Sequence, residues 1–285
     1  MNSPANSTGA TIALEGPLAA GCLRALASHG PLQSLSIDDR AVFGLRQARE
    51  LLSLPGIDWL RLRCPVTCAA ASVLLGIPGL RTLELDTLQA GGILRGFDIP
   101  RTLERFYWPW YALRPDDFEA IAQSPTLRAI GTGHSEITPT ALDALLAMPR
   151  LESLDLESCG IDDALASRLR TGTPLRSLFL AVNPLTRVGL RHIVELESLR
   201  ELDLWETGIT LDDLELLQAL PQLEYLSLGC GDPEHATRRY DPDRLLPLLA
   251  RLPSLQRLEL DGIVLNQTQR AAYAARFAEL KLVER

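Results

Sequence analysis

Hydrophobic residues recur along this chain in a short pattern, Leu-x-x-Leu-x-Leu, in which x is mostly polar. The clearest copy covers residues 199–222, and its neighbours at 151–174 and 175–198 keep the same frame. Copies begin 23 to 25 residues apart, except for a last interval of 32, at Leu32, Ile57, Leu80, Leu103, Leu127, Leu151, Leu175, Leu199, Leu223 and Leu255. A fixed interval of this length indicates a repeat architecture in which each copy forms one small structural unit.

Each copy predicts one strand followed by one helix. In x-Leu-x-Leu-x the two leucines point to one face of a strand and the intervening residues to the other. Helix starts follow at Thr138-Pro139, at Asp241-Pro242 and at Thr210 with Asp213, where capping side chains or an N-terminal proline stand. Because one unit cannot bury its apolar face alone, stacked units are expected to share one core.

The pattern resembles the leucine-rich repeat superfamily over residues 9–265, in the form of bacterial repeats of about 24 residues. The resemblance implies an α/β solenoid, a horseshoe of one domain with a parallel concave β-sheet and convex helices. The asparagine that usually follows the strand survives only as Asn183, and other copies carry Thr207, Cys159 or Ser135 there. The asparagine hydrogen-bond ladder is therefore expected to be incomplete.

The two ends of the repeat array need caps. Residues 1–8 are polar and are predicted to be disordered, and residues 9–31 are predicted to form an N-terminal cap with a partial repeat. The repeats cover residues 32–265. Tyr273, Phe277 and Leu280 stand at i, i+4 and i+7, which predicts a C-terminal capping helix over residues 266–285.

The outward strand positions combine acids with aromatic residues. The acids at these positions are Asp38, Asp39, Glu84, Asp86, Asp155, Glu157, Glu201, Asp203, Glu206, Glu259 and Asp261. The aromatic residues are Trp59, Tyr107, Trp110, Phe179, Trp205 and Tyr225, and the basic residues are Arg61, Arg63, Arg105 and Arg257. Exposed aromatic side chains are enriched at protein interfaces, so this pattern favours a binding surface. Lateral packing between neighbouring strands is the structural alternative.

Two irregular segments interrupt the repeat. Trp108 occupies an inward leucine position, and Thr132 in the next copy is small enough to make room for it. On the outward side, Gly131 and Gly133 are expected to leave a surface notch beside Tyr107 and Trp110. Residues 231–240 follow a strand and lengthen their copy, with Arg238 and Arg239 expected at the tip of the inserted loop. This insertion is either functional or a tolerated surface loop.

Composition narrows the classes of partner and of compartment. The formal net charge is −8, which disfavours a nucleic-acid partner, because phosphate contacts need clustered lysine and arginine. The odd count of 5 cysteines lacks a disulfide framework, and we interpret them as reduced thiols of a cytoplasmic protein. No apolar run reaches the ~18 residues of a membrane span, so no membrane partner is expected.

No catalytic, metal or cofactor site is predicted. Cys64 and Cys68 form the only close cysteine pair, whereas a zinc site needs about four ligands. His134 faces outward near Asp155, but a lone histidine more often bonds a neighbour than catalyses a reaction. The outward acids are spread along a surface rather than gathered in a pocket that would tune their pKa values.

We therefore expect a non-enzymatic scaffold that binds a basic protein partner and is monomeric when free. The predicted partner-binding residues are Trp59, Tyr107, Trp110, His134, Asp155, Glu157, Phe179, Asp203, Trp205, Glu206 and Tyr225. A cytoplasmic immunity or antidote protein that neutralises a toxin fits this expectation. A host-directed bacterial effector and a substrate-recognition subunit of a ligase are the alternatives.

Overall fold

The computed structural model describes residues 9–19, 21–88, 99–108, 113–169 and 172–283. Where the sequence led us to expect one domain, the chain divides into two compact units, one ending at Gly133 and the other beginning at His134. The boundary falls in the copy that carries Gly131 and Gly133.

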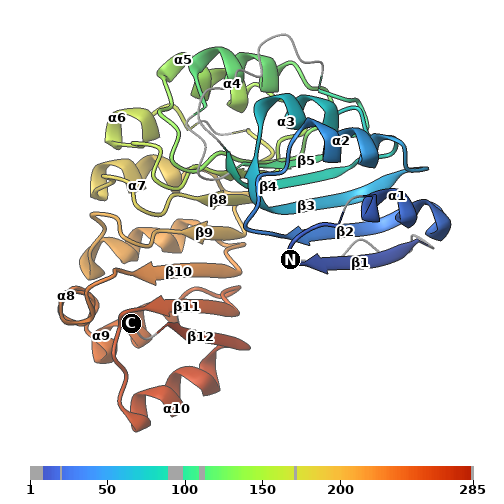
Figure 1. Ribbon diagram of the computed structural model, residues 1–285. Helices are drawn as coiled ribbons and strands as arrows, with labels where there is room; N and C mark the ends of the chain where they lie inside the picture. Colours follow the sequence, from blue (N-terminus) through green and yellow to red (C-terminus); the bar gives the residue numbers. More distant parts are fainter. Residues whose placement is uncertain (1–8, 20, 89–98, 109–112, 170–171, 284–285) are drawn as a thin grey trace. The chain divides into compact units, whose positions relative to one another are not determined.

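The first unit is a parallel sheet covered by helices. Its strands lie in chain order and are β1 (Ala10–Glu15), β2 (Leu32–Asp38), β3 (Ile57–Val66), β4 (Thr82–Leu88), β5 (Arg105–Tyr107) and β6 (Ala129–Gly131). Its helices are α1 (Cys22–Ala25), η1 (Leu26–His29), α2 (Leu45–Leu52), α3 (Cys68–Leu74) and α4 (Pro115–Ala122), where η marks a 3₁₀ helix. The helices lie on one side of the strands, as Figure 1 shows. The partial repeat at the N-terminus is the strand β1, which pairs with β2.

The second unit has the same construction. Its strands, again in chain order, are β7 (Ser153–Asp155), β8 (Ser177–Phe179), β9 (Glu201–Asp203), β10 (Tyr225–Gly229), β11 (Arg257–Asp261) and β12 (Glu279–Val283). Its helices are α5 (Pro139–Leu146), α6 (Asp163–Ala166), α7 (Arg187–Ile193), η2 (Leu211–Ala219), α8 (Pro233–Arg239), α9 (Pro242–Leu249) and α10 (Gln267–Arg276). One face of this sheet packs on the helices, and we call the other its open face.

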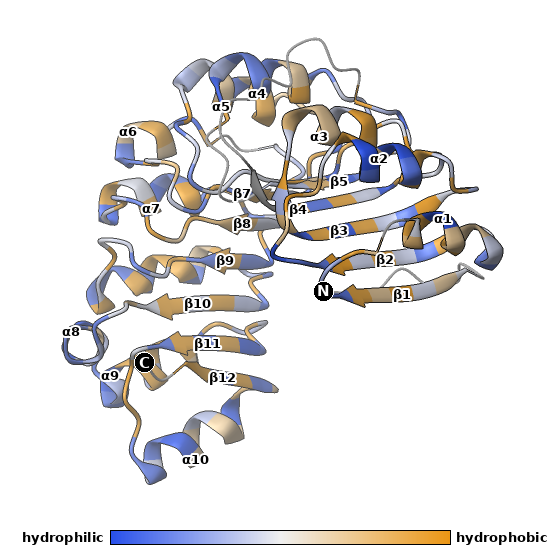
Figure 2. Ribbon diagram, in the orientation of Figure 1, coloured by the Kyte–Doolittle hydropathy of each residue, from blue (hydrophilic) through white to orange (hydrophobic). Residues whose placement is uncertain are grey.

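The core of each unit is built from the repeated leucines. Leu154, Leu178 and Leu202 occupy one register row of β7, β8 and β9, and all three are completely buried. The residues on either side of each leucine remain partly exposed, which is the alternation that the sequence predicts. Figure 2 shows the resulting hydrophobic stripes along the strands.

A tight turn follows the short strands at the same position of successive copies. His134, Ser158, Val182 and Glu206 all have positive φ angles, between 54° and 61°, which is uncommon for residues other than glycine. Their backbone N–H groups donate hydrogen bonds to carbonyl oxygens of the next copy, at 2.8–2.9 Å. These bonds hold the left-handed turns in place and extend the strand ladder beyond the strands themselves.

Asn183 follows one of these turns and is buried. Its Oδ1 atom accepts a hydrogen bond from Ile161 N–H at 2.8 Å, and its Nδ2 atom donates to Leu156 O, Leu180 O and Ala181 O at 2.8–3.1 Å. The side chain of the equivalent Thr207 has one described hydrogen bond, which it donates to Leu204 O. Asn183 therefore binds its own turn and the preceding copy through four hydrogen bonds.

The predicted helix starts are present. Thr138 caps α5 by accepting Ala141 N–H, and Asp241 caps α9 by accepting Asp243 N–H. Thr210 and Asp213 also bond to each other as expected, but the element that they begin, η2, is a 3₁₀ helix. The 24-residue period thus sets both the strand and the start of the segment that follows it.

The C-terminal segment differs from the expected helix over residues 266–285. Helix α10 ends at Arg276, and Leu280 lies on β12, which pairs in parallel with β11. Tyr273 and Phe277 are buried, as a capping helix requires, but Leu280 pairs with Leu258 in the sheet. The strand forms because Leu280 and Leu282 extend the two leucine rows of β11.

The segment 231–240 is helical rather than a loop, because α8 occupies most of it. Asp232 caps this helix, and Arg239 donates to the carbonyl oxygen of Thr207. The buried Tyr240 hydroxyl donates to Ile209 O at 2.7 Å. The expectation that Arg239 lies at the tip is therefore wrong, because this side chain turns back onto the preceding copy.

Candidate functional site

The open face of the second unit brings together most of the predicted partner-binding residues. Asp155, Phe179 and Asp203 form one register row across β7, β8 and β9. Glu157, Trp205 and Glu206 stand in the turns that follow β7 and β9. We call the set Asp155, Glu157, Phe179, Asp203, Trp205 and Glu206 the acid–aromatic patch.

The remaining predicted residues lie elsewhere. Tyr225 is on β10 and His134 begins the second unit, where its N–H donates to Glu157 O. Trp59 and Tyr107 belong to the first unit, on β3 and β5. Trp110 lies outside the described residues.

Asp155 and Asp203 have a structural role as well as a place on the surface. Asp155 Oδ1 accepts the N–H of Glu157 at 3.0 Å, and Asp203 Oδ1 accepts the N–H of Trp205 at 2.9 Å. Each aspartate thus closes a turn two residues ahead, a local bond that aspartate favours. The repeated Asp-Leu-x after the strand leucine is a sequence signal for this turn.

The environment of the patch disfavours negative charge. The pKa of Asp155 is raised from its ordinary 3.8 to about 6, chiefly by burial and also by the charges of Glu157 and Asp203, while the hydrogen bond from Glu157 N–H acts in the opposite direction. Burial likewise raises the pKa of Asp203, with Glu259 and Glu157 adding to the effect. The two aspartates therefore carry a desolvated charge that gains from a cation beside them.

A second cluster on the same face is internally neutralised. Arg257 Nη2 lies 2.5 Å from Glu201 Oε1, and its guanidinium carbon lies 5.2 Å from the centre of the Tyr225 ring. Ser177 Oγ donates to Glu201 Oε2 at 2.7 Å, and together with Arg257 it outweighs burial and lowers the pKa of Glu201. Ser177, Glu201 and Arg257 are not among the partner-binding residues that the sequence predicts. The signal for them was their shared repeat position, which places them in one row with Tyr225.

Glu259 is also neutralised. Its two carboxylate oxygens contact the Tyr225 hydroxyl at 3.0 Å and Lys281 Nζ at 2.7 Å. Burial, followed by the charges of Glu259 and Asp203, raises the pKa of Tyr225 above its ordinary value. Glu259 of β11 therefore meets a cation of its own chain, Lys281 of β12.

The open face of the first unit also pairs its charges. Arg61 Nε lies 3.3 Å from Glu84 Oε2, and Arg63 lies 3.9 Å from Asp38. Trp59 stands two residues before Arg61 on β3 and is partly buried. Its indole Nε1 has no hydrogen-bond acceptor among the described residues. Four of the outward acids thus pair with basic side chains, and four belong to the acid–aromatic patch: the paired acids are Asp38, Glu84, Glu201 and Glu259, and the patch acids are Asp155, Glu157, Asp203 and Glu206.

The notch expected beside Tyr107 is filled. Gly131 is buried, and a Cβ atom placed on it would stand 2.6 Å from Tyr107 Cδ1. The ring of Tyr107 therefore lies over the glycine and occupies the space that a side chain would take. Trp108 and Thr132 are also buried, which fits the expected compensation between them.

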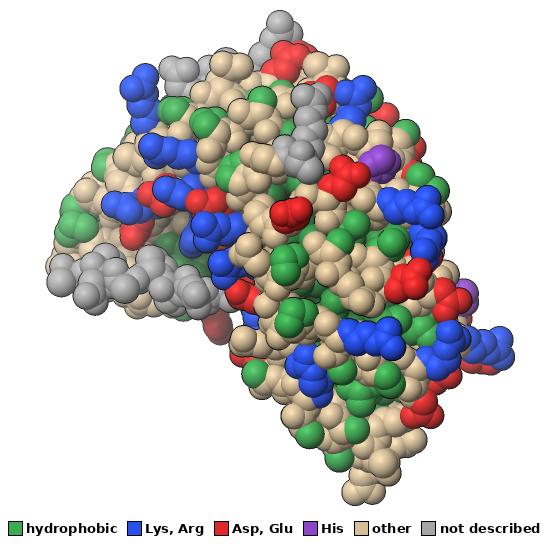
Figure 3. Space-filling model, turned by 180° about the vertical axis from the view of Figure 1, so that it is seen from behind, with side chains coloured by type: hydrophobic (Ala, Val, Ile, Leu, Met, Phe, Trp, Pro, Cys, Tyr) green, Lys and Arg blue, Asp and Glu red, His purple; other side chains and the backbone are tan. Residues whose placement is uncertain are grey.

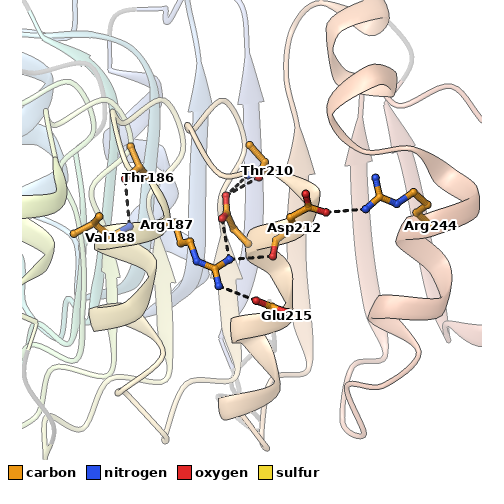
Figure 4. A network of polar contacts seen from close by, with 8 residues as sticks. Thr186, Arg187, Val188, Thr210, Asp212, Glu215 and Arg244 are labelled. Carbon is orange, nitrogen blue, oxygen red and sulfur yellow. Dashed lines mark hydrogen bonds and ion pairs between the residues drawn. The ribbon is translucent and has the colours of Figure 1, made fainter.

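The helical side of the second unit carries charges that pair with one another. Figure 4 shows Arg187 of α7 directed at η2 and bound to Glu215, at 2.7 Å. The guanidinium of Arg187 also donates to Asp213 at 3.2 Å. Arg244 meets Asp212 at 2.7 Å in the same view. Basic and acidic side chains also lie next to one another on the face shown in Figure 3.

The described residues add two general findings. No group of three or more histidine, cysteine, aspartate or glutamate residues among them is arranged to hold a metal ion. Across the same stretches of chain, no helix is both long enough and apolar enough to cross a membrane.

Comparison with known proteins supports the fold. No family model and no curated protein matches the chain. It is similar to the crystal structure of an internalin from Listeria monocytogenes, with a TM-score of 0.53 and 16% identity over 96% of this chain and 79% of that chain. Together with the parallel strands in repeat order, this likeness shows an α/β leucine-rich repeat solenoid, as the sequence predicts. At this identity the likeness concerns the fold alone.

A second similar structure is that of the TLR13–ssRNA13 complex. Its TM-score is 0.48 and its identity 20%, over 88% of this chain but only 36% of that chain. The chain therefore spans little more than a third of the length of that protein.

Proposed function

We propose that the protein is a non-enzymatic scaffold that binds a protein partner on the open face of the second unit. The observation that carries this proposal is the row Asp155–Phe179–Asp203, in which an aromatic ring stands between two carboxylates on adjacent strands. A partly exposed ring among desolvated acids costs free energy in the unbound protein. A partner that covers the ring and neutralises the acids would recover that cost.

The partner is basic in this proposal. The outward positions of β7–β9 carry acids without a lysine or arginine, and opposite charge across an interface speeds association and selects partners. The specific form that we propose is a cytoplasmic antidote that neutralises a basic toxin and is a monomer when free. A host-directed effector is a second form, motivated by the presence of a single lysine, Lys281. A substrate-recognition subunit has no comparable observation in its favour.

The other predicted residues extend the proposed surface within their own units. Tyr225 and His134 flank the acid–aromatic patch in the second unit, and Trp59, Tyr107 and Trp110 would contribute from the first. Tyr107 already covers Gly131, so its ring offers one face at most.

The test begins with affinity capture from the native organism, identification of the captured protein and its purification. Binding of the purified partner to Phe179→Ala and Trp205→Ala is then measured by calorimetry, with Val188→Ala as control. Val188 is 53% exposed on α7, so its truncation removes a comparable apolar group from the helical side. We expect each patch variant to bind about 30-fold more weakly, as interface hot spots do, and the control to bind normally. Normal binding by both patch variants would show that the partner does not use this face.

A further inference from the structure

The second unit contains its own example of how this surface holds a guanidinium group. Arg257 lies over the ring of Tyr225 while its Nη2 atom meets the carboxylate of Glu201. An aromatic ring below and a carboxylate at the edge satisfy the two preferences of arginine, stacking and charged hydrogen bonds. In this row, residues of three neighbouring strands, β9, β10 and β11, build the site.

The acid–aromatic patch repeats the ring-and-carboxylate arrangement two residues along the strands. Phe179 takes the place of the ring, and Asp155 and Asp203 stand on either side of it. The three strands β7–β9 are described in full, and their outward residues include no arginine or lysine that could fill the patch. The chain thus supplies its own arginine, Arg257, at the Tyr225 ring, whereas β7–β9 supply none at the Phe179 ring.

We propose that the acid–aromatic patch receives an arginine side chain of a basic protein partner, with its guanidinium on the Phe179 ring between Asp155 and Asp203. The inference rests on the proposed function, because it names the group by which the partner is held. Strands two apart in a sheet are separated by roughly 10 Å. A planar guanidinium with N–H···O bonds of about 2.8 Å on both sides bridges such a gap when the side chains lean inward.

The charges around the patch agree with a cationic occupant. Glu157 and Glu206 add two further acids at the ends of the strands, and Glu259 faces the patch from β11 with its carboxylate already bound to Lys281. Asp155 and Asp203 each accept one turn N–H, and Asp203 also accepts a side-chain hydrogen bond from Ser227. A carboxylate offers about four lone-pair sites, so both aspartates keep acceptor positions for a donor from outside. Their raised pKa values mean that an incoming cation also removes electrostatic strain between the acids.

Arginine is favoured over lysine by the ring. A guanidinium stacks on an aromatic face and gives up its hydration more readily than an ammonium group does. An acidic surface without the ring would bind both cations alike. A higher affinity for arginine than for lysine therefore distinguishes this site from a surface that is merely acidic.

The test uses two synthetic probes, a hexa-arginine peptide and a hexa-lysine peptide, titrated into the full chain by calorimetry at low and at physiological ionic strength. Phe179→Leu removes the ring and keeps an apolar side chain. Asp155→Asn with Asp203→Asn removes two charges and keeps both turn acceptors. Glu119→Gln with Glu197→Gln removes two exposed charges outside the patch and serves as the charge-matched control.

We expect the parent to bind hexa-arginine at least fivefold more tightly than hexa-lysine. Phe179→Leu should abolish this preference, and the double aspartate variant should weaken both peptides about tenfold, while the control changes neither by more than twofold. Urea unfolding of each variant confirms that it is folded. Equal affinity of the parent for the two peptides, or equal loss in the control, would overturn the inference.

This failure can be told apart from failure of the proposed function. In one outcome, the parent protein binds hexa-arginine and hexa-lysine equally while Trp205→Ala still loses the natural partner. In that case the open face binds the partner, but through groups other than an arginine on Phe179. If Trp205→Ala and Phe179→Ala both keep the natural partner, the open face is not the binding surface.

Discussion

The ring of Tyr107 on β5 lies over Gly131 on β6, its register partner in the sheet, so closely that a methyl group on Gly131 would overlap it. This cross-strand pair explains how an aromatic residue at an outward position is accommodated without being fully exposed. One of the aromatic side chains that the sequence suggests for binding thus also has a packing contact. The pair can be tested by itself, because both residues belong to the first unit.

Gly131→Ala should lower the free energy of unfolding by about 1–3 kcal/mol, because the added Cβ meets the Tyr107 ring and one of them must move. In a Tyr107→Ala background the same substitution should cost little, since the obstructing ring is gone. Urea unfolding of the single and double variants gives the coupling energy. An equal loss in both backgrounds would place the cost in the strand backbone instead.

Trp108 and Thr132 are buried and predict a second coupled pair. Thr132→Leu restores the repeat leucine but should destabilise by roughly 1–3 kcal/mol through overpacking. Trp108→Leu should also destabilise, by leaving a cavity. The double variant should recover part of both losses, and denaturant melts of the three variants measure it. Strict additivity would show that the two side chains do not share one layer.

Asn183→Ala should cost about 2–4 kcal/mol, because it leaves Ile161 N–H and several buried carbonyl groups without their partner. Thr207→Ala at the equivalent position removes one described hydrogen bond and should cost about 1 kcal/mol. Asn183→Asp keeps the acceptor for Ile161 but loses the donors, so it should not restore stability. A similar small loss at both positions, measured by thermal and urea unfolding, would contradict the special role of the asparagine.

The sequence predicts the fold correctly where a position has a single physical requirement, such as an apolar side chain. The spaced leucines predicted every strand from β2 to β11, because only the inward positions must be apolar. The prediction from the sequence is incomplete where a residue fits both a helix pattern and a strand pattern. Leu280 continues the helical spacing of Tyr273 and Phe277 and also begins the alternation with Leu282, and the sheet decides between them.

The candidate site was predictable as a list of outward residues but not as a charge balance. A repeat position identifies Asp155 and Glu201 equally as outward acids. Whether such an acid meets a cation depends on residues of other copies, as with Arg257 and Glu201, which are two copies and 56 residues apart. Contacts of this range follow from side-chain conformation, which the period does not encode.

Asp155 should make stability depend on pH. Its folded pKa of about 6 lies above the 3.8 expected in the unfolded chain, so between these values the folded state holds a proton that the unfolded state has released. The stability that Asp155 contributes is therefore fully present below about pH 4 and is lost as the pH rises through 6. Asp155→Asn, which stays neutral and keeps the acceptor for Glu157 N–H, should raise the free energy of unfolding by up to about 3 kcal/mol at pH 7.5 and change it little near pH 4. Urea unfolding across this range, with the exposed Glu119→Gln as control, measures the difference. A gain that is the same at every pH, or a loss at pH 7.5, would show that the carboxylate is not strained in the folded protein.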